Sequence, residues 1–545
     1  MFEGRVAVRR ARMGSSQRSQ RPFGAGMSNN RGSLQVAPDL LDVFSDIARR
    51  NPRRPAIVHN GHALSYRRLQ ESANALATRL GPDPGTVAVP AVHAPETVVA
   101  LLGVLAAGGT YCPVDPVFPA ARRHAMAAAA QCRTALSGRS GDVLGLNARS
   151  VELPAPAEFP DDPPGSPPPD PAGASPERPA HILFTSGSTG QPKPVVTPRG
   201  AVSVTARALG ALFHLTPEDR VLQFASLNWD TCFEEILPTL TTGATLVLDR
   251  DAHSGSFPRF LRLVERERIT VLDMPTAFWH ELVHHLVESG DRLPSCLRLL
   301  VIGGEAAGPA RLADWARLPT GGIRLLNTYG CTETTQITHA VDLAGPLAPG
   351  RTWDGTAPAP IGHALPHVVE LLEADGELLV GGPALALGYL GLPEATATRF
   401  VTRDGRRYFR TGDRMSRDPD GLLTHRGRLD GELKVRGIRV DPAEVEAHLT
   451  GHPGVTAAAV TGTTAAGRTT LVAYVVAHPR TPAGQLDRDL LAYLRARVPG
   501  HLVPGRITVV PRLVHTPSGK IDRAGCHLRY AATAPDRSKE TSLEH

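Results

Sequence analysis

A glycine- and hydroxyl-rich loop that ends in a lysine is the strongest local sign of chemistry in this chain of 545 residues. The loop spans residues 185–193 (TSGSTGQPK) and directly follows the apolar run HILF. Glycines let a backbone approach an anion, hydroxyl and amide groups can donate hydrogen bonds to its oxygens, and Lys193 adds a positive charge. The spacing differs from that of a Walker loop. Because such a loop is by itself more often a simple turn, the other motifs must decide whether it binds phosphate.

Four later segments also carry residues that could act on a nucleotide. They are residues 327–335 (NTYGCTETT), 408–413 (YFRTGD), 427–430 (GRLD) with Lys434 after it, and 516–523 (TPSGKIDR). In this order, the five segments resemble the motifs of the family that joins acyl-CoA synthetases, firefly luciferases and the adenylation domains of nonribosomal peptide synthetases. The resemblance covers roughly residues 35 to 530 and implies an ATP-dependent enzyme that converts a carboxylate into its acyl-AMP.

The resemblance implies ATP and Mg²⁺ as cofactors, and the chemistry explains why these residue types are needed. Attack of a carboxylate on the α-phosphate brings two anions together, so cations and N–H donors must surround the phosphates. By resemblance, Glu333 binds Mg²⁺, Thr332 contacts the α-phosphate, and Lys520 bridges the carboxylate and the α-phosphate during the attack. Thr332, Glu333 and Lys520 are therefore the implied catalytic residues.

The implied nucleotide-binding residues come from the same segments and from residues 303–305 (GGE). Tyr329 is expected to stack on adenine, and Asp413, assisted by Arg428, to hold both ribose hydroxyls. Asp430 stands at the hinge about which a small C-terminal domain rotates after adenylation. The full set is Thr185, Ser186, Gly187, Ser188, Thr189, Gly190, Lys193, Gly303, Gly304, Glu305, Asn327, Tyr329, Gly330, Asp413 and Arg428.

The chain departs from the family pattern at three positions. Pro194 follows the loop lysine where a glycine is common, Arg199 replaces a frequent histidine, and Glu432 replaces a frequent glutamine. None of these changes removes a principal catalytic group, but they leave the affinity of the loop for phosphate open.

A segment at residues 224–244 resembles the substrate-pocket motif of the amino-acid-activating members. Asp230 occupies the position of the aspartate that opens that pocket. A buried carboxylate is costly without a counter-charge, and the ammonium group of an amino acid supplies one. Acyl- and aryl-CoA ligases generally lack this acid. Asp230 therefore favours an amino-acid substrate, the alternative being an aspartate that only caps a helix.

Alignment with that subfamily places further residues in the pocket, and two of them are acids. Three carboxylates in one cavity repel one another, so a second cationic group on the substrate is the expected partner of Glu234 and Asp273. The lining resembles that of domains that select β-lysine, while lysine, ornithine, arginine and cyclised arginine stay open. Glu234 could instead face away and pair with an arginine. The implied pocket comprises Asp230, Thr231, Glu234, Asp273, Val301, Gly303, Thr328, Gln336 and Ile337, with Lys520 last.

The elements that must position these motifs form two predicted domains after a basic tail at residues 1–33. Between residues 34 and 429, apolar runs such as HILFT, TVLDM and LRLLVIGG alternate with helical patterns, which indicates α/β units with largely parallel strands. By resemblance this large domain also carries a small β subdomain. Residues 98–108 predict a buried helix that ends at a glycine, and the proline-rich residues 153–180 predict an exposed surface connection. Residues 430–530 predict a mobile α+β domain, and a short tail, 531–545, follows.

Composition argues against several classes of protein. Seven arginines and one acid in residues 1–33 account for the formal net charge of +6, so we expect no nucleic-acid partner. No apolar run is long enough to span a bilayer, so no membrane is expected. Six scattered cysteines without metal-ligand spacing favour a reducing, cytoplasmic location.

Residues 521–545 contain no motif for a phosphopantetheine-bearing serine, so we expect a freestanding enzyme. Its partner would be a separate carrier protein, whose phosphopantetheine thiol accepts the acyl group in peptide-antibiotic biosynthesis. The sequence leaves open whether a small activating protein is also needed. Two rival hypotheses are an acyl- or aryl-CoA ligase, against which Asp230 argues, and an inactive binding homologue. The retention of Lys193, Glu333, Asp413 and Lys520 argues against the second rival.

Overall fold

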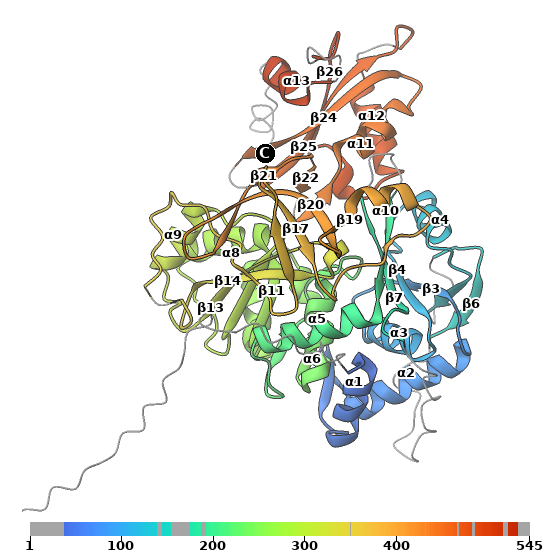
Figure 1. Ribbon diagram of the computed structural model, residues 1–545, viewed down its shortest axis with the longest axis vertical. Helices are drawn as coiled ribbons and strands as arrows, with labels where there is room; N and C mark the ends of the chain where they lie inside the picture. Colours follow the sequence, from blue (N-terminus) through green and yellow to red (C-terminus); the bar gives the residue numbers. More distant parts are fainter. Residues whose placement is uncertain are drawn as a thin grey trace, which may run out of the picture. The chain divides into compact units, whose positions relative to one another are not determined.

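The structure is a computed structural model that describes residues 38–138, 144–153, 175–186, 192–348, 350–430, 432–435, 437–465, 468–481, 485–515 and 521–531. The predicted basic tail and, apart from Ala531, the predicted C-terminal tail lie outside these ranges. Within them, a large α/β domain with mixed sheets precedes a small α+β domain (Figure 1). The predicted fold class is therefore confirmed.

The phosphate-loop motif lies in a seven-stranded sheet with the order β18-β8-β7-β4-β3-β5-β6. Strands β3 to β7 pair in parallel, whereas β8 is antiparallel to both β7 and β18. The bounds are β3 Thr86–Pro90, β4 Thr110–Val114, β5 Thr134–Ser137, β6 Arg149–Glu152, β7 Pro179–Thr185, β8 Lys193–Pro198 and β18 Gly388–Tyr389. The predicted buried helix is α3 (Pro95–Ala106), which is apolar all round and is followed by Gly108 at φ +77°.

The predicted surface connection over residues 153–180 extends too far at its C-terminal end. Strand β7 already begins at Pro179, and Ala180 is only 2% exposed. These two residues extend the apolar run HILF, and a proline is tolerated as the first residue of a strand. Residues 154–174 of the predicted connection lie outside the described residues.

The substrate-pocket motifs belong to a nine-stranded sheet with the order β15-β14-β13-β12-β11-β9-β10-β1-β2. Its six inner strands from β13 to β1 are parallel, which confirms the predicted largely parallel arrangement, and β14, β15 and β2 are antiparallel at its edges. The bounds are β1 Pro55–His59, β2 His62–Ser65, β9 Arg220–Leu222, β10 Thr245–Leu248, β11 Val271–Pro275, β12 Leu299–Gly303, β13 Arg324–Gly330, β14 Ile337–Ala344 and β15 His363–Ala364.

Helices pack on both sheets because each sheet is apolar on its faces. One hydrophobic core combines residues of both sheets with α1 (Leu40–Arg50), α2 (Tyr66–Leu80), α3, α5 (Arg199–Leu212) and α6 (Thr231–Thr242). A second core contains α7 (Phe257–Arg266), α8 (Thr276–Ser289) and α9 (Pro309–Arg317), and a third contains α4 (Ala120–Ala129). Among the helices in the described ranges, none combines the length and apolar character needed to cross a bilayer.

A smaller sheet carries the predicted ribose motif. It joins β16 (Val369–Leu372), β17 (Glu377–Gly381), β19 (Phe400–Arg403), β20 (Arg406–Arg417) and β21 (Leu423–Arg428), and α10 (Pro393–Arg399) precedes β19. This sheet is the β subdomain that the resemblance implied.

The small domain, dark orange to red in Figure 1, has a hydrophobic core of its own that runs from Val435 to Ile507. Strands β22 (Leu433–Val435) and β23 (Ile438–Val440) form a hairpin, and β24 (Val455–Ala465), β25 (Arg468–Ala477) and β26 (Arg506–Val509) form a sheet. Helices α11 (Pro442–Thr450), α12 (Leu486–Arg495) and α13 (Arg523–Tyr530) accompany them. A boundary at residue 430 stays a prediction, and this separate core agrees with it.

Candidate active site

The predicted substrate residues gather at the carboxyl ends of β11, β12 and β13. Asp273 of β11 is the register partner of Val301 of β12, and Gly303 closes β12. The Thr328 hydroxyl of β13 donates to the Ile302 carbonyl at 2.9 Å. Ligands of parallel α/β sheets bind at this edge because loops and helix starts leave a crevice there.

Glu234 lies in the first turn of α6, and Asp230 and Thr231 stand where that helix begins. Asp230 is the N-cap residue, yet its side chain makes no capping hydrogen bond, so a capping role does not account for it. The Gln336 amide donates to the Asp230 carbonyl at 3.4 Å. Gln336 has φ +70° and Ile337 begins β14, so the pocket wall includes a backbone conformation that non-glycine residues rarely adopt.

Burial raises the pKa of all three carboxyl groups of this pocket, and at Glu234 the other two acids raise it further. Burial, then Asp273 and Asp230, raise the pKa of Glu234 well above its ordinary value. Burial raises the pKa of Asp273 to about 7 and that of Asp230 to about 6. Asp273 is only 3% exposed, and its buried Oδ2 has no hydrogen-bond partner. No Arg, Lys or His of the described residues forms an ion pair with any of the three, so Glu234 has no arginine partner there.

The phosphate-loop motif is described at its two ends only. Thr185 ends β7 and is the register partner of Lys193, which begins β8. The buried Thr185 hydroxyl has no partner, and the Lys193 ammonium lies 5.9 Å from the centre of the Tyr389 ring. Gly187, Ser188, Thr189 and Gly190 lie outside the described residues, as does Lys520.

Glu333 is fully buried in the short 3-10 helix η3 (Thr332–Thr334). Its Oε1 accepts a hydrogen bond from the Tyr389 hydroxyl at 2.8 Å, and Arg439 Nη1 lies 3.3 Å from both of its oxygens. Burial alone would raise the pKa of Glu333, but Arg439 and Tyr389 outweigh it and lower this pKa below its ordinary value.

The donor set at Glu333 fits a magnesium ion that arrives with a nucleotide. Mg²⁺ is usually held by one or two carboxylates together with substrate phosphates. Glu333 offers one carboxylate, and the unpartnered Thr185 hydroxyl offers a donor for a phosphate oxygen. Within the described ranges, no group of three or more His, Cys, Asp or Glu residues could hold a metal ion by itself.

The predicted adenine and ribose residues lie together on β13 and β20. The Tyr329 hydroxyl donates to Asp413 Oδ2 at 2.6 Å, and the ammonium of Lys434 lies 5.6 Å from the centre of the Tyr329 ring. Arg428 Nη1 and His425 Nε2 reach Asp413 Oδ1 at 2.8 and 3.1 Å. Burial would raise the pKa of Asp413, but these cations hold it well below its ordinary value.

Two further predicted residues have structural partners. The Asn327 amide donates to the Pro360 carbonyl at 2.7 Å, and its buried Oδ1 has no partner. A Cβ atom at Gly330 would overlap the carbonyl of Gln336, so only glycine fits between β13 and the pocket wall. Stacking of Tyr329 on adenine and binding by Asn327 stay predictions.

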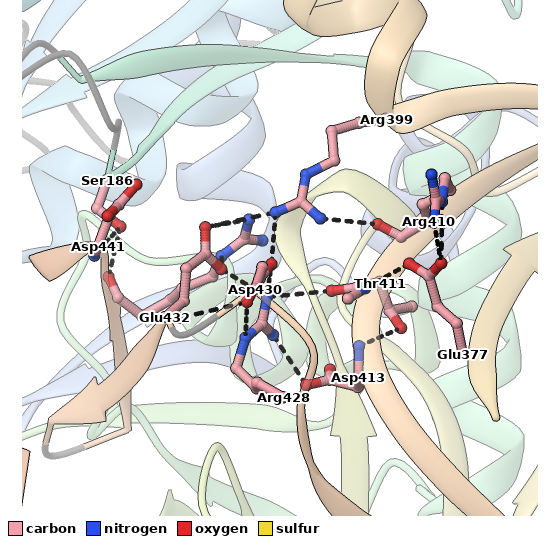
Figure 2. A network of polar contacts seen from close by, with 12 residues as sticks. Ser186, Glu377, Arg399, Arg410, Thr411, Asp413, Arg428, Asp430, Glu432 and Asp441 are labelled. Atoms are coloured by element: carbon pink, nitrogen blue, oxygen red, sulfur yellow. Dashed lines mark hydrogen bonds and ion pairs between the residues drawn. The ribbon is translucent and has the colours of Figure 1, made fainter. Parts of the chain in front are cut away.

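The predicted hinge residue Asp430 belongs to a network of ion pairs (Figure 2). Arg428 reaches Asp430 Oδ1 and Oδ2 at 2.7 and 2.6 Å, and Arg399 reaches Oδ2 at 2.9 Å. Arg428 also lies 2.6 Å from Glu432 Oε2, and Arg439 binds both oxygens of Glu432. Figure 2 shows Arg428 between Asp413 and Glu432, so the network joins the ribose motif to the small domain.

The β22–β23 hairpin of the small domain contacts the predicted nucleotide site. The Gly437 N–H donates to Glu305 Oε1 at 2.6 Å, and Gly304, at φ +85°, packs against Gly437 so closely that a side chain at Gly304 would meet it. The Ser186 hydroxyl donates to the Arg439 carbonyl and accepts from the Asp441 N–H, both at 3.0 Å. In this structure the face of the small domain that meets the site is therefore this hairpin.

Two cavities lie between residues of the large domain and residues of the small domain. A cavity of about 520 Å³ is lined by residues at the start of α4, including Val117 and Phe118, and by residues of the small domain, including Pro499 and Val503. A narrow cavity of about 20 Å³ shares Phe118 and Pro499 with it and reaches Thr185, Ser186 and Arg439.

Sequence reasoning missed Tyr389 and Arg439, and noted Glu432 only as a departure from a pattern. Tyr389 stands far from every motif, and only the pairing of β18 with β8 brings it to Glu333. Arg439 stands two residues after Gly437 in a basic stretch, which gave a weak signal because charged residues in a hairpin usually face solvent.

Comparison with known proteins matches two family models to this chain. The AMP-binding enzyme model matches residues 44–390, and the AMP-binding enzyme C-terminal domain matches residues 444–520. The first covers the phosphate loop, the pocket acids and Glu333, and the second covers most of the small domain.

Relatives of this chain include synthetases of natural products. An isonitrile lipopeptide synthase of Streptomyces coeruleorubidus is 40% identical over 91% of this chain, which spans 34% of that protein. The novobiocin biosynthesis protein H of Streptomyces niveus is 34% identical over 91% of this chain and 83% of its own. A solved NRPS protein with adenylation and PCP domains superposes with a TM-score of 0.76 at 26% identity, over 91% of this chain and 85% of its own. The chain therefore belongs to the AMP-binding enzyme family of adenylate-forming ligases.

Proposed function

We propose that this chain activates an amino acid that carries a second cationic group as its aminoacyl-AMP, using ATP and Mg²⁺. The acyl group then passes to the phosphopantetheine thiol of a carrier protein. Among the dibasic amino acids, β-lysine is our first candidate because the pocket lining resembles that of β-lysine-selecting domains. A cytoplasmic location and a peptide-antibiotic pathway belong to the same proposal.

The observation that carries the proposal is the buried, unpartnered Asp273 Oδ2 beside Glu234 and Asp230. A carboxylate removed from water needs a cation or a donor, and without one it takes up a proton instead. A substrate with two ammonium groups supplies both charges that this pocket lacks. A neutral amino acid would satisfy Asp230 alone and leave the pair Glu234–Asp273 uncompensated.

The same residues divide the work of the first half-reaction. Asp230 holds one ammonium group and so directs the substrate carboxylate toward the nucleotide, while Glu234 and Asp273 hold the second. Asp413 and Arg428 hold the ribose, and Glu333 holds the metal, which neutralises phosphate charge when it is bound. Lys520 is the proposed bridge between the carboxylate and the α-phosphate.

Transfer to a carrier protein is supported by the relatives and by a cavity lined by both domains. The solved NRPS relative contains a PCP domain beside its adenylation domain. The cavity of about 520 Å³ beside Val117 and Phe118 would offer room for a flexible arm near the contact between the domains.

The test is amino-acid-dependent exchange of labelled pyrophosphate into ATP. The panel contains β-lysine, lysine, ornithine and arginine, their neutral analogues, and several aryl and fatty acids. Strong exchange with one dibasic amino acid, lost in Lys520→Ala, is the expected result. Exchange only with an aryl or fatty acid would keep the adenylation chemistry and reject the proposed roles of Asp230, Glu234 and Asp273.

A further inference from the structure

Arg439 of the small domain forms an ion pair with Glu333, the carboxylate that the proposed function assigns to the metal. Its Nη1 lies 3.3 Å from both oxygens of Glu333, and the Glu333 side chain is fully buried. A magnesium ion binds carboxylate oxygen at about 2.0–2.1 Å and keeps its other water or phosphate ligands close around it. The guanidinium therefore stands where part of that ligand shell would be, and it adds a positive charge beside a divalent one.

The geometry of Arg439 leaves it little freedom to move aside. Its Nε and Nη2 bind the two oxygens of Glu432, the second at 3.0 Å, so that only Nη1 points to Glu333. Glu432 is itself fixed by Arg428 at 2.6 Å. Side chain and backbone are held together, because the Arg439 carbonyl accepts a hydrogen bond from Ser186. Arg439 can therefore leave Glu333 only if the β22–β23 hairpin moves with it.

We propose that Arg439 and a magnesium ion compete for Glu333, so that the β22–β23 hairpin docks as seen here only after metal-bound pyrophosphate has left. The inference rests on the proposed function, because it takes Glu333 as the metal ligand of the adenylation step. Arg439 is a positioning residue that replaces the metal as the counter-charge of Glu333. Metal loss and hairpin docking thereby become one linked equilibrium, which orders the two half-reactions.

Glu432 should strengthen the hold of Arg439 on Glu333 in this chain. The acid stands where the sequence pattern of the family often has a glutamine. It binds Arg439 through two hydrogen bonds in which both partners are charged, whereas a glutamine would be a neutral acceptor. Docking should therefore resist metal more strongly here than in Glu432→Gln, which keeps the shape of the side chain.

The test is hydrogen–deuterium exchange of peptides that cover the β22–β23 hairpin, measured on the whole chain with AMP present. Magnesium chloride with pyrophosphate is added in one arm, and pyrophosphate alone in the other. In the wild-type protein the metal should speed amide exchange of the hairpin by about fivefold or more, because it releases the docked state. In Glu432→Gln, half of that response should appear at a lower magnesium concentration.

Two variants separate competition at Glu333 from a general loosening of the domains. Arg439→Met should lose the response to metal, whereas Arg439→Lys, which keeps the charge, should regain part of it. Arg122→Gln is the matched control, because it removes a different ion pair between the domains, Arg122 to Glu444 at 2.8 Å. In Arg122→Gln, the hairpin amides should exchange hydrogen faster than in the wild type without metal, and magnesium should still speed this exchange.

A wild-type hairpin that ignores magnesium, or an Arg439→Met hairpin that responds as the wild type does, would overturn the competition. Pyrophosphate exchange on the same preparations keeps the two claims apart. Exchange activity without a metal response rejects the competition alone, and a metal response without exchange activity for any acid rejects the proposed function.

Discussion

The acids of the proposed substrate pocket and the acids around the hinge differ in their partners. Around the hinge, Asp413, Asp430 and Glu432 are each bound by Arg428, and the pKa values of Asp413 and Asp430 are lowered. In the pocket, Glu234 and Asp273 have no cation among the described residues, and their pKa values are raised. The protein supplies its own counter-charges around the hinge, whereas in the proposed function the substrate supplies them to the pocket acids.

The largest effect on stability should come from removing Arg428, the arginine shared by the acids around the hinge. Arg428→Ala would leave Asp413, Asp430 and Glu432 without their shared guanidinium, which is only 9% exposed. Removing one partner of a buried ion pair typically costs about 3–5 kcal/mol, so urea unfolding should show a loss of that order. The control is Arg403→Ala, whose ion pair with Glu373 is exposed and should contribute about 0–1 kcal/mol. Similar losses of unfolding free energy in Arg428→Ala and Arg403→Ala would mean that the ion pairs of Arg428 contribute no more than an exposed pair.

The next effect concerns the pocket and appears only with a substrate. Glu234→Gln removes a charge that the second ammonium group would meet, and a hydrogen bond to a charged group contributes about 1.5–3 kcal/mol. The ratio of kcat/KM for a dibasic amino acid to that for its neutral analogue should therefore fall about 10- to 100-fold. Asp273→Asn should shift the ratio in the same direction. An unchanged ratio in both variants would mean that neither acid faces the substrate.

A smaller effect is expected in the pH dependence of stability without ligand. Burial raises the pKa of Asp273 to about 7 in the folded protein, so the folded state binds more protons than the unfolded state between pH 4 and 7. The contribution of this group to stability is therefore largest at low pH and falls as pH rises, by at most about 1.4 kcal/mol per pH unit. Asp273→Asn should flatten that fall, measured by urea unfolding at several pH values. A steeper fall in the variant would contradict the raised pKa.

Sequence reasoning reached the fold class and the order of the motifs because both are local. The apolar runs around residues 182 and 300 are long enough to indicate parallel strands, and the motif residues stand at fixed spacings within them. The sequence also pointed to Asp230, Glu234 and Asp273 as neighbours, because the start of α6 and strand β11 each lie in a recognisable segment. The start of β7 at Pro179 was missed because a proline-rich stretch hides the strand that follows it.

The contacts of Arg439 and Tyr389 could not be read from the sequence, because each depends on pairing between distant segments. Tyr389 reaches Glu333 across 56 positions, and Arg439 reaches it across 106. Such partners are chosen by the packing of two domains and by the antiparallel edge of a sheet. No local spacing encodes either arrangement.

The central claim is that the substrate pocket awaits a second positive charge. The most direct measurement is pyrophosphate exchange by the unmodified protein with lysine-type diamino acids and with norleucine-type analogues that match them in shape but lack the distal ammonium group. We predict exchange with one diamino acid at an efficiency at least about tenfold above its analogue, which corresponds to about 1.4 kcal/mol. An analogue that is activated equally well or better would contradict the account, because Glu234 and Asp273 would then hold no substrate charge.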